Sequence, residues 1–361
     1  MGCPQIPELD YAQLSKIIHE DAGERNIPIN GAIDITSSCN LRCVHCYIRD
    51  TDCGQELSFK EICEIFDQIA DAGCLWLCIT GGEPLIRTDF RDIYSYAKRK
   101  GFLITLFTNG TLLTPSLADF LADEPPFVID ISLYGVTEGT YEKVTGVRGS
   151  YRGCMNGIEL ALERRLPLKL KTIIMTLNAN EFHDMRRYAK NLGVPFRHDA
   201  LINPRIDGSL EPTRYRLTPE EIVSLELEDP ELADEISKVY IELYGIRGKR
   251  EKLYNCGAGR GMFHITSDGK LNICTIASEP GYDLRTGNFN TGFYDVFPEV
   301  LKKMRTHVSE CQSCAAANMC GQCPAWAELE NGDPEAKIEF LCQTARLRVD
   351  AFVKRNNLIF K

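Results

Sequence analysis

From residue 31 onward, short apolar runs alternate with longer amphipathic stretches along the chain. The apolar runs have the length and β-branched content of buried strands and lie at 31–36, 75–80, 102–107, 127–132, 167–175 and 194–202. The intervening stretches carry helical periodicity at 58–72, 88–100, 114–123, 150–165 and 180–192. The alternation of six strands with five helices predicts an α/β fold with a parallel sheet and helices outside it.

The spacing of the repeats indicates the kind of sheet. A full eight-unit barrel needs about 250 residues, whereas here about 170 residues carry six units. This ratio favours a partial (β/α)6 TIM-like barrel, with an open doubly wound sheet as the alternative. In either fold, functional groups gather at the carboxyl ends of the strands.

The flanking segments have patterns of their own. Residues 8–20 have helical periodicity, 203–217 form a loop rich in Pro, Gly and charge, and 218–245 form helix interrupted near Asp229–Pro230. Residues 262–274 predict a β-hairpin that turns at Asp268–Gly269. We place a boundary at 246–255, which gives three parts: an N-terminal helical extension (1–30), the barrel with linking helices (31–245) and a C-terminal cysteine-rich domain ending in a helix (246–361).

Composition narrows the class of protein. The 361 residues are 44% hydrophobic and 25% charged, with a net charge of −10 and no basic stripe. Nucleic acid is therefore not expected as a partner, because phosphate contacts dominate such affinity. No apolar run reaches the ~20 residues of a membrane span, and the N-terminus lacks the regions of a signal peptide. We expect a cytoplasmic protein, and its 16 cysteines then indicate metal ligation rather than disulfides.

Cys39, Cys43 and Cys46 form the sharpest motif, in a loop after the first strand. Zinc sites and electron-transfer cubes take four protein ligands, so three thiolates indicate a cluster with one iron left open. A partial zinc site or chance clustering is the alternative.

A second motif ends the second strand, at Thr80–Pro84 (TGGEP). Gly81 and Gly82 permit positive φ and close backbone approach to a ligand, and the Glu83 carboxylate can accept hydrogen bonds from an ammonium group. A plain strand-to-helix turn is the alternative.

Together the two motifs closely resemble those of radical S-adenosylmethionine (SAM) enzymes. The resemblance implies a [4Fe–4S] cluster whose open iron chelates SAM and reduces it to a 5′-deoxyadenosyl radical. It implies that the GGEP segment, Pro84 included, holds the methionyl amino group, that His45 lies against the adenine, and that Asn109 and Ser132 belong to the SAM site. Sulfatase maturases carry an arginine twelve residues after that serine, where this chain has Val144; Arg148 is a weak substitute.

The last two strands carry unusual polarity for apolar surroundings, at Lys171, Thr172, Arg197, Asp199, Asn203 and Arg205. Arg197 and Asp199 share a face of one strand. They form either a structural ion pair lining the barrel or a catalytic group for substrate contact or proton transfer.

The C-terminal cysteines resemble the SPASM extension of radical SAM enzymes, which carries auxiliary iron–sulfur clusters. The resemblance implies one cluster on Cys311, Cys314, Cys320 and Cys342. It implies a second cluster on Cys256, Cys274 and Cys323, with one site open or filled by a group other than cysteine. Two residues separate Cys320 from Cys323 where the family has three, so the cluster to which Cys323 belongs is undecided. A zinc ribbon is the alternative to both clusters.

The overall resemblance, over about residues 31–345, is to radical SAM/SPASM maturases of ribosomally made peptides. It implies a precursor peptide as substrate, a separate small leader-peptide-binding protein and a flavodoxin- or ferredoxin-type electron donor. The reaction would be a thioether or carbon–carbon crosslink or an oxidative decarboxylation. The alternatives are tetrapyrrole side-chain decarboxylation, sulfatase maturation and a zinc-bound interaction module that is not an enzyme.

Overall fold

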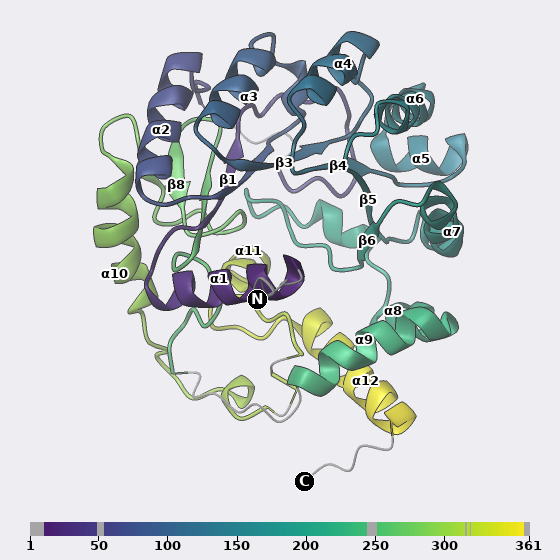
Figure 1. The fold of residues 1–361 in the computed structure, drawn as a ribbon. Helices are drawn as coiled ribbons and strands as arrows, with labels where there is room; N and C mark the ends of the chain where they lie inside the picture. The colour runs from purple at the N-terminus through teal and green to yellow at the C-terminus, as the bar shows by residue number, and fades with distance from the viewer. Residues whose placement is uncertain (1–10, 49–53, 244–250, 315, 318, 357–361) are drawn as a thin grey trace, which may run out of the picture.

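A nine-stranded sheet organises the protein, in the order β6-β5-β4-β3-β2-β1-β7-β8-β9 (Figure 1). The structure is a computed structural model and describes residues 11–48, 54–243, 251–314, 316–317 and 319–356. The strands are β1 (Asn30–Asp34), β2 (Trp76–Thr80), β3 (Leu103–Thr108), β4 (Val128–Ser132), β5 (Leu168–Ile173), β6 (Phe196–Asp199), β7 (Met262–Ile265), β8 (Lys270–Asn272) and β9 (Tyr282–Asp283).

Strands β1 to β6 pair in chain order and all in parallel. Each lies within one residue of its predicted apolar run or inside it. The predicted partial barrel of six strands is therefore confirmed, and parallel pairing puts all the carboxyl ends at one rim.

The helices are α1 (Tyr11–Glu24), α2 (Phe59–Asp71), α3 (Phe90–Arg99), α4 (Pro115–Asp123), α5 (Glu138–Thr145), α6 (Ser150–Glu163), α7 (Phe182–Leu192), α8 (Pro219–Glu228), α9 (Pro230–Leu243), α10 (Phe297–Leu301), α11 (Pro324–Asn331) and α12 (Glu339–Asn356). Helices α2 to α7 cover the outer face of the barrel strands, and α8, α9 and α12 pack against one another beyond β6 (Figure 1). Short 3₁₀ turns lie at Pro84–Ile86, Ala179–Glu181, Glu211–Tyr215 and Glu310–Gln312, and a π-helical turn lies at Thr291–Val296.

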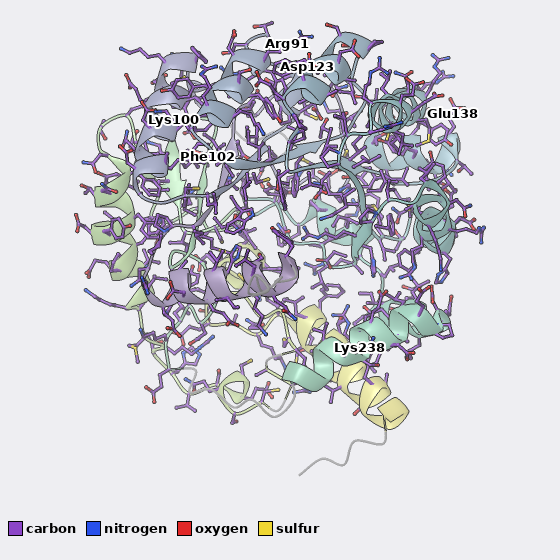
Figure 2. All side chains as sticks on the ribbon, viewed as in Figure 1. Arg91, Lys100, Phe102, Asp123, Glu138 and Lys238 are labelled. Carbon is purple, nitrogen blue, oxygen red and sulfur yellow. The ribbon has the colours of Figure 1, made fainter. Side chains whose placement is uncertain are left out.

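Helix α2 shows why these segments are helical. Ser58 and Glu61 form the predicted capping box, which satisfies two backbone donors of the first turn. The side chains at helical spacing, Ile62, Ile65, Phe66 and Ile69, are buried. On the outer helices, Arg91, Asp123 and Glu138 lie on the solvent side (Figure 2).

Of two helical features, one agrees with the prediction and one was not predicted. The interruption expected at Asp229–Pro230 is present, because α8 ends at Glu228 and α9 starts at Pro230. Helix α5 was not predicted; it is short, opens with the Thr137 cap and ends at Gly146 in the left-handed region.

The predicted hairpin is confirmed as β7 and β8, with Gly269 at the turn (φ 87°). It also continues the barrel sheet, because β7 pairs in parallel with β1 from Asn30↔Met262 to Ile33↔Ile265. Gly31 is required here, since a Cβ would lie 2.3 Å from the ring of Phe263. Strand β9, which the sequence did not predict, completes the sheet.

The two faces of the barrel strands differ in polarity. Ile33, Leu77, Ile104 and Ile129 belong to the main hydrophobic core, which the helices cover. Side chains alternate along a strand, so the residues between these core positions point to the inner face of the barrel. Many of them are polar, and we call them the lumen set: Asp34, Cys78, Asp130, Lys171, Arg197 and His264. A polar lumen thus lies inside an apolar shell.

Candidate functional site

The loop of Cys39, Cys43 and Cys46 lies against the TGGEP turn at the barrel rim. Gly82 N–H donates to the carbonyl of Thr36 (2.8 Å), and Glu83 N–H donates to that of Ser38 (2.9 Å). A Cβ on Gly81 would lie 2.2 Å from the Thr36 oxygen, and one on Gly82 would lie 2.2 Å from the Ser38 oxygen. The two glycines are therefore needed because the two motifs pack backbone to backbone.

The middle of the cysteine loop is joined to β3 and α5. The side chain of Asn109 donates to Asn40 (3.0 Å), which places this predicted SAM-site residue beside the loop. Arg42 N–H donates to Thr145 O (2.9 Å), and Val44 N–H donates to Val144 O (3.0 Å). Val144, at the position of the sulfatase-maturase arginine, is fully buried and supports the loop through its backbone.

Glu56 is a supporting residue that sequence reasoning missed. One of its carboxylate oxygens accepts from Thr36 Oγ1 (2.8 Å), from Ser37 N–H (2.8 Å) and from Ser37 Oγ (2.9 Å). It thereby fixes the start of the cysteine loop. No motif marks Glu56; only a fold that brings residue 56 back to residue 36 makes it visible.

Glu83 has hydrogen-bond partners within the protein. Its carboxylate is fully buried and accepts from Thr108 Oγ1 (2.7 Å), Asn109 N–H (2.7 Å) and Leu85 N–H (3.1 Å). These three donors leave one of the carboxylate's roughly four lone-pair sites free, so the binding of an ammonium group by Glu83 stays a prediction. Glu83 holds the ends of β2 and β3 together through its contacts with Thr108 and Asn109.

His45 lies inside the rim with its ring edge-on to Tyr134, at 4.8 Å between centroids. Its Nε2 is 3.2 Å from the Tyr134 hydroxyl, and burial lowers the pKa of His45 to about 4. The imidazole is therefore neutral at pH 7. Its Nδ1 is buried without a partner in the protein, which leaves one ring nitrogen for a ligand. Ser132, 8% exposed, ends the neighbouring β4.

The three N-terminal thiols are half-buried, and burial raises the pKa of Cys39 above its ordinary value. Among the described residues, no three His, Cys, Asp or Glu side chains surround a single metal ion position. Thiolates of a cubane each bind a different iron atom, so their sulfurs stand further apart than the ligands of one ion. Three thiols on one loop, beside an orphaned imidazole nitrogen, suit the corner of such a cluster.

The C-terminal thiols fall into the two predicted groups. Cys311, Cys314, Cys320 and Cys342 line one cavity. Burial, with the nearby charges of the other three, raises the pKa of Cys320 to about 11. Burial also raises the pKa of Cys323 to about 11, with Cys274 and Cys256 as its charged neighbours. The structure therefore brings the predicted sets together; their ligation of iron stays a prediction.

Arg197 and Asp199 are both exposed on β6, and within the described residues they form no ion pair with each other. Of the two alternatives, the structure therefore does not show the barrel-lining ion pair, and a role in substrate contact or proton transfer stays a prediction. Asp199 accepts from Leu201 N–H (2.9 Å). The other polar residues of this region bond locally: Arg205 pairs with Glu211, Asn203 donates to Pro204 O and Thr172 donates to Ile173 O.

Lys171 is a cation on the lumen face of β5, beside Arg197 of β6. Its Nζ lies 3.0 Å from the centroid of the Phe107 ring. Burial lowers the pKa of Lys171 to about 8, partly offset by Cys78 and Asp130. Asp130 is 2% exposed, and its Oδ1 has no partner in the protein.

A cavity of about 190 Å³ lies between the cysteine loop and the β7–β8 hairpin. Ser37 and Ile48 line it from the loop, and Thr266 and Asn272 line it from the hairpin. Thr275, which directly follows Cys274, lines it as well. We name it the seam cavity, because it lies where β1 of the barrel meets β7. Asp34 and His264 also line it, and sequence reasoning predicted neither.

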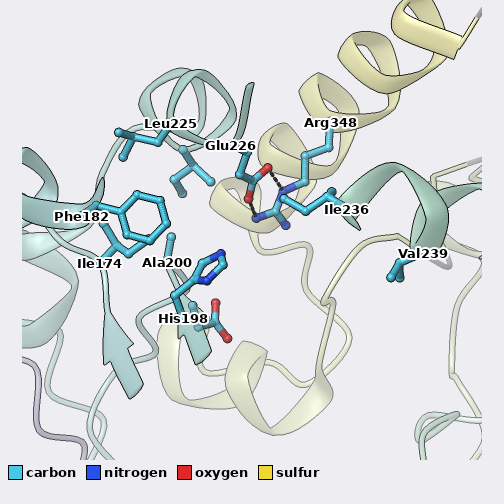
Figure 3. Close-up of a pocket in the computed structure, with 11 residues that line it drawn as sticks. Ile174, Phe182, His198, Ala200, Leu225, Glu226, Ile236, Val239 and Arg348 are labelled. Carbon is cyan, nitrogen blue, oxygen red and sulfur yellow. Dashed lines mark hydrogen bonds and ion pairs between the residues drawn. The ribbon is translucent and has the colours of Figure 1, made fainter. Parts of the chain in front are cut away.

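A second cavity, of about 220 Å³, lies outside the barrel between β6 and helices α8, α9 and α12 (Figure 3). Apolar side chains such as Phe182 and Ile236 line it, and the Arg348–Glu226 ion pair (Nε–Oε2 3.0 Å) borders it. The His198 ring points into it (Figure 3), and burial lowers the pKa of His198 to about 4. This cavity lies on the side of β6 away from the lumen.

A cysteine loop fixed to a glycine turn at the rim of a six-stranded partial barrel defines a radical SAM enzyme, and residues 33–190 match the model of the radical SAM superfamily. The chain is accordingly a radical SAM enzyme, related to SPASM-domain peptide maturases and to AdoMet-dependent heme synthases.

Three comparisons represent these relatives. AdoMet-dependent heme synthase of Methanosarcina barkeri is 26% identical over 331 residues, which are 85% of this chain and 94% of that protein. PqqA peptide cyclase of Bradyrhizobium diazoefficiens is 29% identical over 280 residues, 73% of this chain and 71% of that one. Streptococcus suis SuiB, solved with its precursor peptide SuiA, superposes with a TM-score of 0.69 at 18% identity, covering 95% of this chain and 84% of its own. The last match shows the fold.

No helix in the described ranges has both the length and the apolar character to cross a bilayer. As a radical SAM enzyme the protein uses SAM and a [4Fe–4S] cluster. When bound, the cluster would supply the electron that cleaves SAM; the residues around the cysteine loop would orient SAM and shield the radical from water.

Proposed function

We propose that this enzyme modifies a ribosomally made precursor peptide, using SAM for hydrogen abstraction and the C-terminal clusters to accept an electron from the substrate radical. The resulting change is a thioether or carbon–carbon crosslink, or an oxidative decarboxylation. Cys39, Cys43 and Cys46 hold the SAM-binding cluster. The residues that surround SAM are Gly81, Gly82, Glu83, Pro84, His45, Asn109 and Ser132.

The observation that carries this proposal is the seam cavity. One wall belongs to the cysteine loop and another to the residue that follows Cys274, so a group inside it lies between the radical source and the proposed electron acceptor. Its lining combines apolar side chains, Ile48, Ile206 and Ala277, with Ser, Thr and Asn side chains and the Lys270 amine. The polar groups can bond the amides of a peptide. Its volume of about 190 Å³ admits one or two side chains.

Peptide relatives support the same proposal. A peptide cyclase and a mycofactocin maturase align over most of this chain, and SuiB was solved with its precursor peptide. A separate small leader-binding protein and a flavodoxin- or ferredoxin-type donor would complete the system. Exposed Arg197 and Asp199, at the rim on β6, are proposed to contact the incoming peptide.

A second candidate is side-chain chemistry on a tetrapyrrole. The alignment with a heme synthase over 94% of that protein favours it. Size opposes it, because ligand pockets for drug-sized molecules are about 300–1,000 Å³ and a rigid macrocycle is larger than the seam cavity.

One experiment separates the two candidates. Reconstituted enzyme, SAM and reductant are incubated with the peptide encoded beside the gene or with an iron porphyrin bearing propionate groups. We expect 5′-deoxyadenosine together with a mass change of the peptide. Loss of carbon dioxide from the porphyrin, with the peptide unchanged, would favour the second candidate.

A further inference from the structure

Asp34 and His264 form a buried pair across the seam between the barrel and the hairpin. Asp34 lies on β1 and His264 on β7, where His264 pairs with Ala32 in register. The Nε2 atom of His264 is 3.1 Å from Asp34 Oδ2, and the two residues are 3% and 6% exposed.

The pair has hydrogen-bonding capacity that the protein does not use. Asp34 Oδ1 and His264 Nδ1 are both buried, and neither has a partner in the protein. A pair that served only to join two strands would have its remaining polar atoms satisfied, because orphaned buried polar atoms are rare and costly. Both residues line the seam cavity, so a group bound there can supply the missing partners.

The arrangement fixes which nitrogen can accept a proton. A carboxylate only accepts hydrogen bonds, so the Asp34 contact holds the hydrogen of a neutral imidazole on Nε2. The other nitrogen, Nδ1, then carries a bare lone pair. Once protonated, the imidazolium is stabilised by the adjacent carboxylate, as in the His–Asp part of a catalytic triad.

We propose that His264, oriented by Asp34, is the proton acceptor of the reaction in the seam cavity. The inference rests on the proposed function. In a crosslink, a substrate C–H and an X–H group become a C–X bond. One hydrogen atom goes to the 5′-deoxyadenosyl carbon, one electron goes to an iron–sulfur acceptor, and the proton of X–H goes to His264 Nδ1. Atoms and electrons balance, and the proton is the part that a side chain must take.

The substrate is therefore a peptide residue that carries a proton donor, such as a thiol or a backbone amide, beside the C–H that is attacked. Ser37 and Thr275 also line the cavity, and their hydroxyls can hold its neighbouring amides. Asp34 is a positioning residue, because it acts through the imidazole.

The test measures product formed per 5′-deoxyadenosine released, with the peptide encoded beside the gene. His264→Gln keeps an amide donor for Asp34 and should retain the iron content and the SAM cleavage of the wild type. Product per 5′-deoxyadenosine should fall about 100-fold, since general base catalysis contributes about 10²–10⁴-fold. His264→Ala should regain product with added imidazole, and Asp34→Asn should show a smaller fall.

The matched control is His198→Gln, the same substitution at a half-buried histidine outside the lumen (Figure 3). It should leave the product ratio unchanged. If His264→Gln gives the wild-type ratio, or if imidazole fails to rescue His264→Ala, His264 is not the acceptor although the peptide function stands. If the wild type leaves the peptide unmodified, the proposed function and this inference both fall.

Discussion

The two cysteine-bearing regions are built differently, although both are expected to hold iron–sulfur clusters. The N-terminal loop is fixed by backbone hydrogen bonds to distant elements: Gly82 and Glu83 on one side, Thr145 and Val144 on the other. Each partner comes from the end of a barrel strand or from helix α5. This loop is therefore held in place by the barrel before any metal binds.

The C-terminal thiols rest on local turns instead. The backbone bonds Ala317 N–Cys314 O (3.2 Å) and Cys342 N–Ile338 O (3.0 Å) span three and four residues. The side chain of Gln322 joins the segments, through Ala336 O (2.7 Å) and Ile338 N–H (3.0 Å), and Cys256 is exposed. Because metal binding supplies folding energy where the site is not preformed, this region should depend on its clusters and the barrel loop should not.

The largest effect should come from replacing Cys39, Cys43 and Cys46 together by Ala. We expect 5′-deoxyadenosine formation to be abolished, since no thiolate remains to hold the SAM-binding cluster, while iron bound by the C-terminal thiols stays. Chromatography of the nucleoside and iron analysis measure both. Cys63→Ala on α2 is the control and should behave as the wild type; SAM cleavage at the normal rate in the triple variant would refute the assignment.

Gly82→Ala tests whether the barrel loop is preformed. Its Cβ would lie 2.2 Å from Ser38 O, so the cysteine loop must move; overpacking costs about 1–3 kcal/mol. We expect a lower melting temperature and weaker SAM binding by calorimetry.

Gly139→Ala is the matched control, since nothing lies within 4 Å of a Cβ there. In helix α5 it should be neutral or stabilising by up to about 1 kcal/mol. Equal SAM affinity and stability in the two variants would mean that the close packing of the two motifs does not matter.

Cys314→Ala tests the C-terminal region. Iron and sulfide should fall by about one cluster, and product formation should suffer more than SAM cleavage. Hydrogen exchange should speed up around residues 311–323 and remain slow at Arg42 and Val44. Unchanged iron would show that Cys314 is not a ligand, and equal loosening of both regions would remove the contrast between them.

The smallest effect concerns Lys171. Its pKa is lowered from 10.5 to about 8 by burial, so the folded chain binds fewer protons than the unfolded chain between those values. Stability should therefore rise with pH from about 8 to 10.5. Lys171→Met should be more stable than the wild type at pH 7, and the difference should shrink as the pH approaches 10.5.

Denaturant unfolding at several pH values measures this, with exposed Lys190→Met as the surface-charge control. A difference between Lys171→Met and the wild type that does not change with pH would contradict the burial of this amine.

Local patterns were enough to predict the six barrel strands, the helix break before Pro230 and the hairpin at Gly269, because each depends on neighbouring residues. The pairing of β1 with β7 was not predictable, since Asp34 and His264 are 230 residues apart and no local signal joins them. Helix α5 is too short for its periodicity to stand out. The motif around Glu83 was recognisable, but the direction of its carboxylate depends on Thr108 and Asn109, which only the fold brings near.

The parallel pairing of β1 with β7 has a consequence for the newly made chain. On the ribosome, β1 emerges early, and its outer edge has no strand to bond until residues 262–265 follow. At about 5–20 residues per second this wait is on the order of 10–50 s, with an apolar strand edge open to other chains. Truncation before the hairpin should leave the β1 edge unpaired and cause aggregation. We therefore expect the C-terminal region, through β7, to protect the barrel from pairing with other chains.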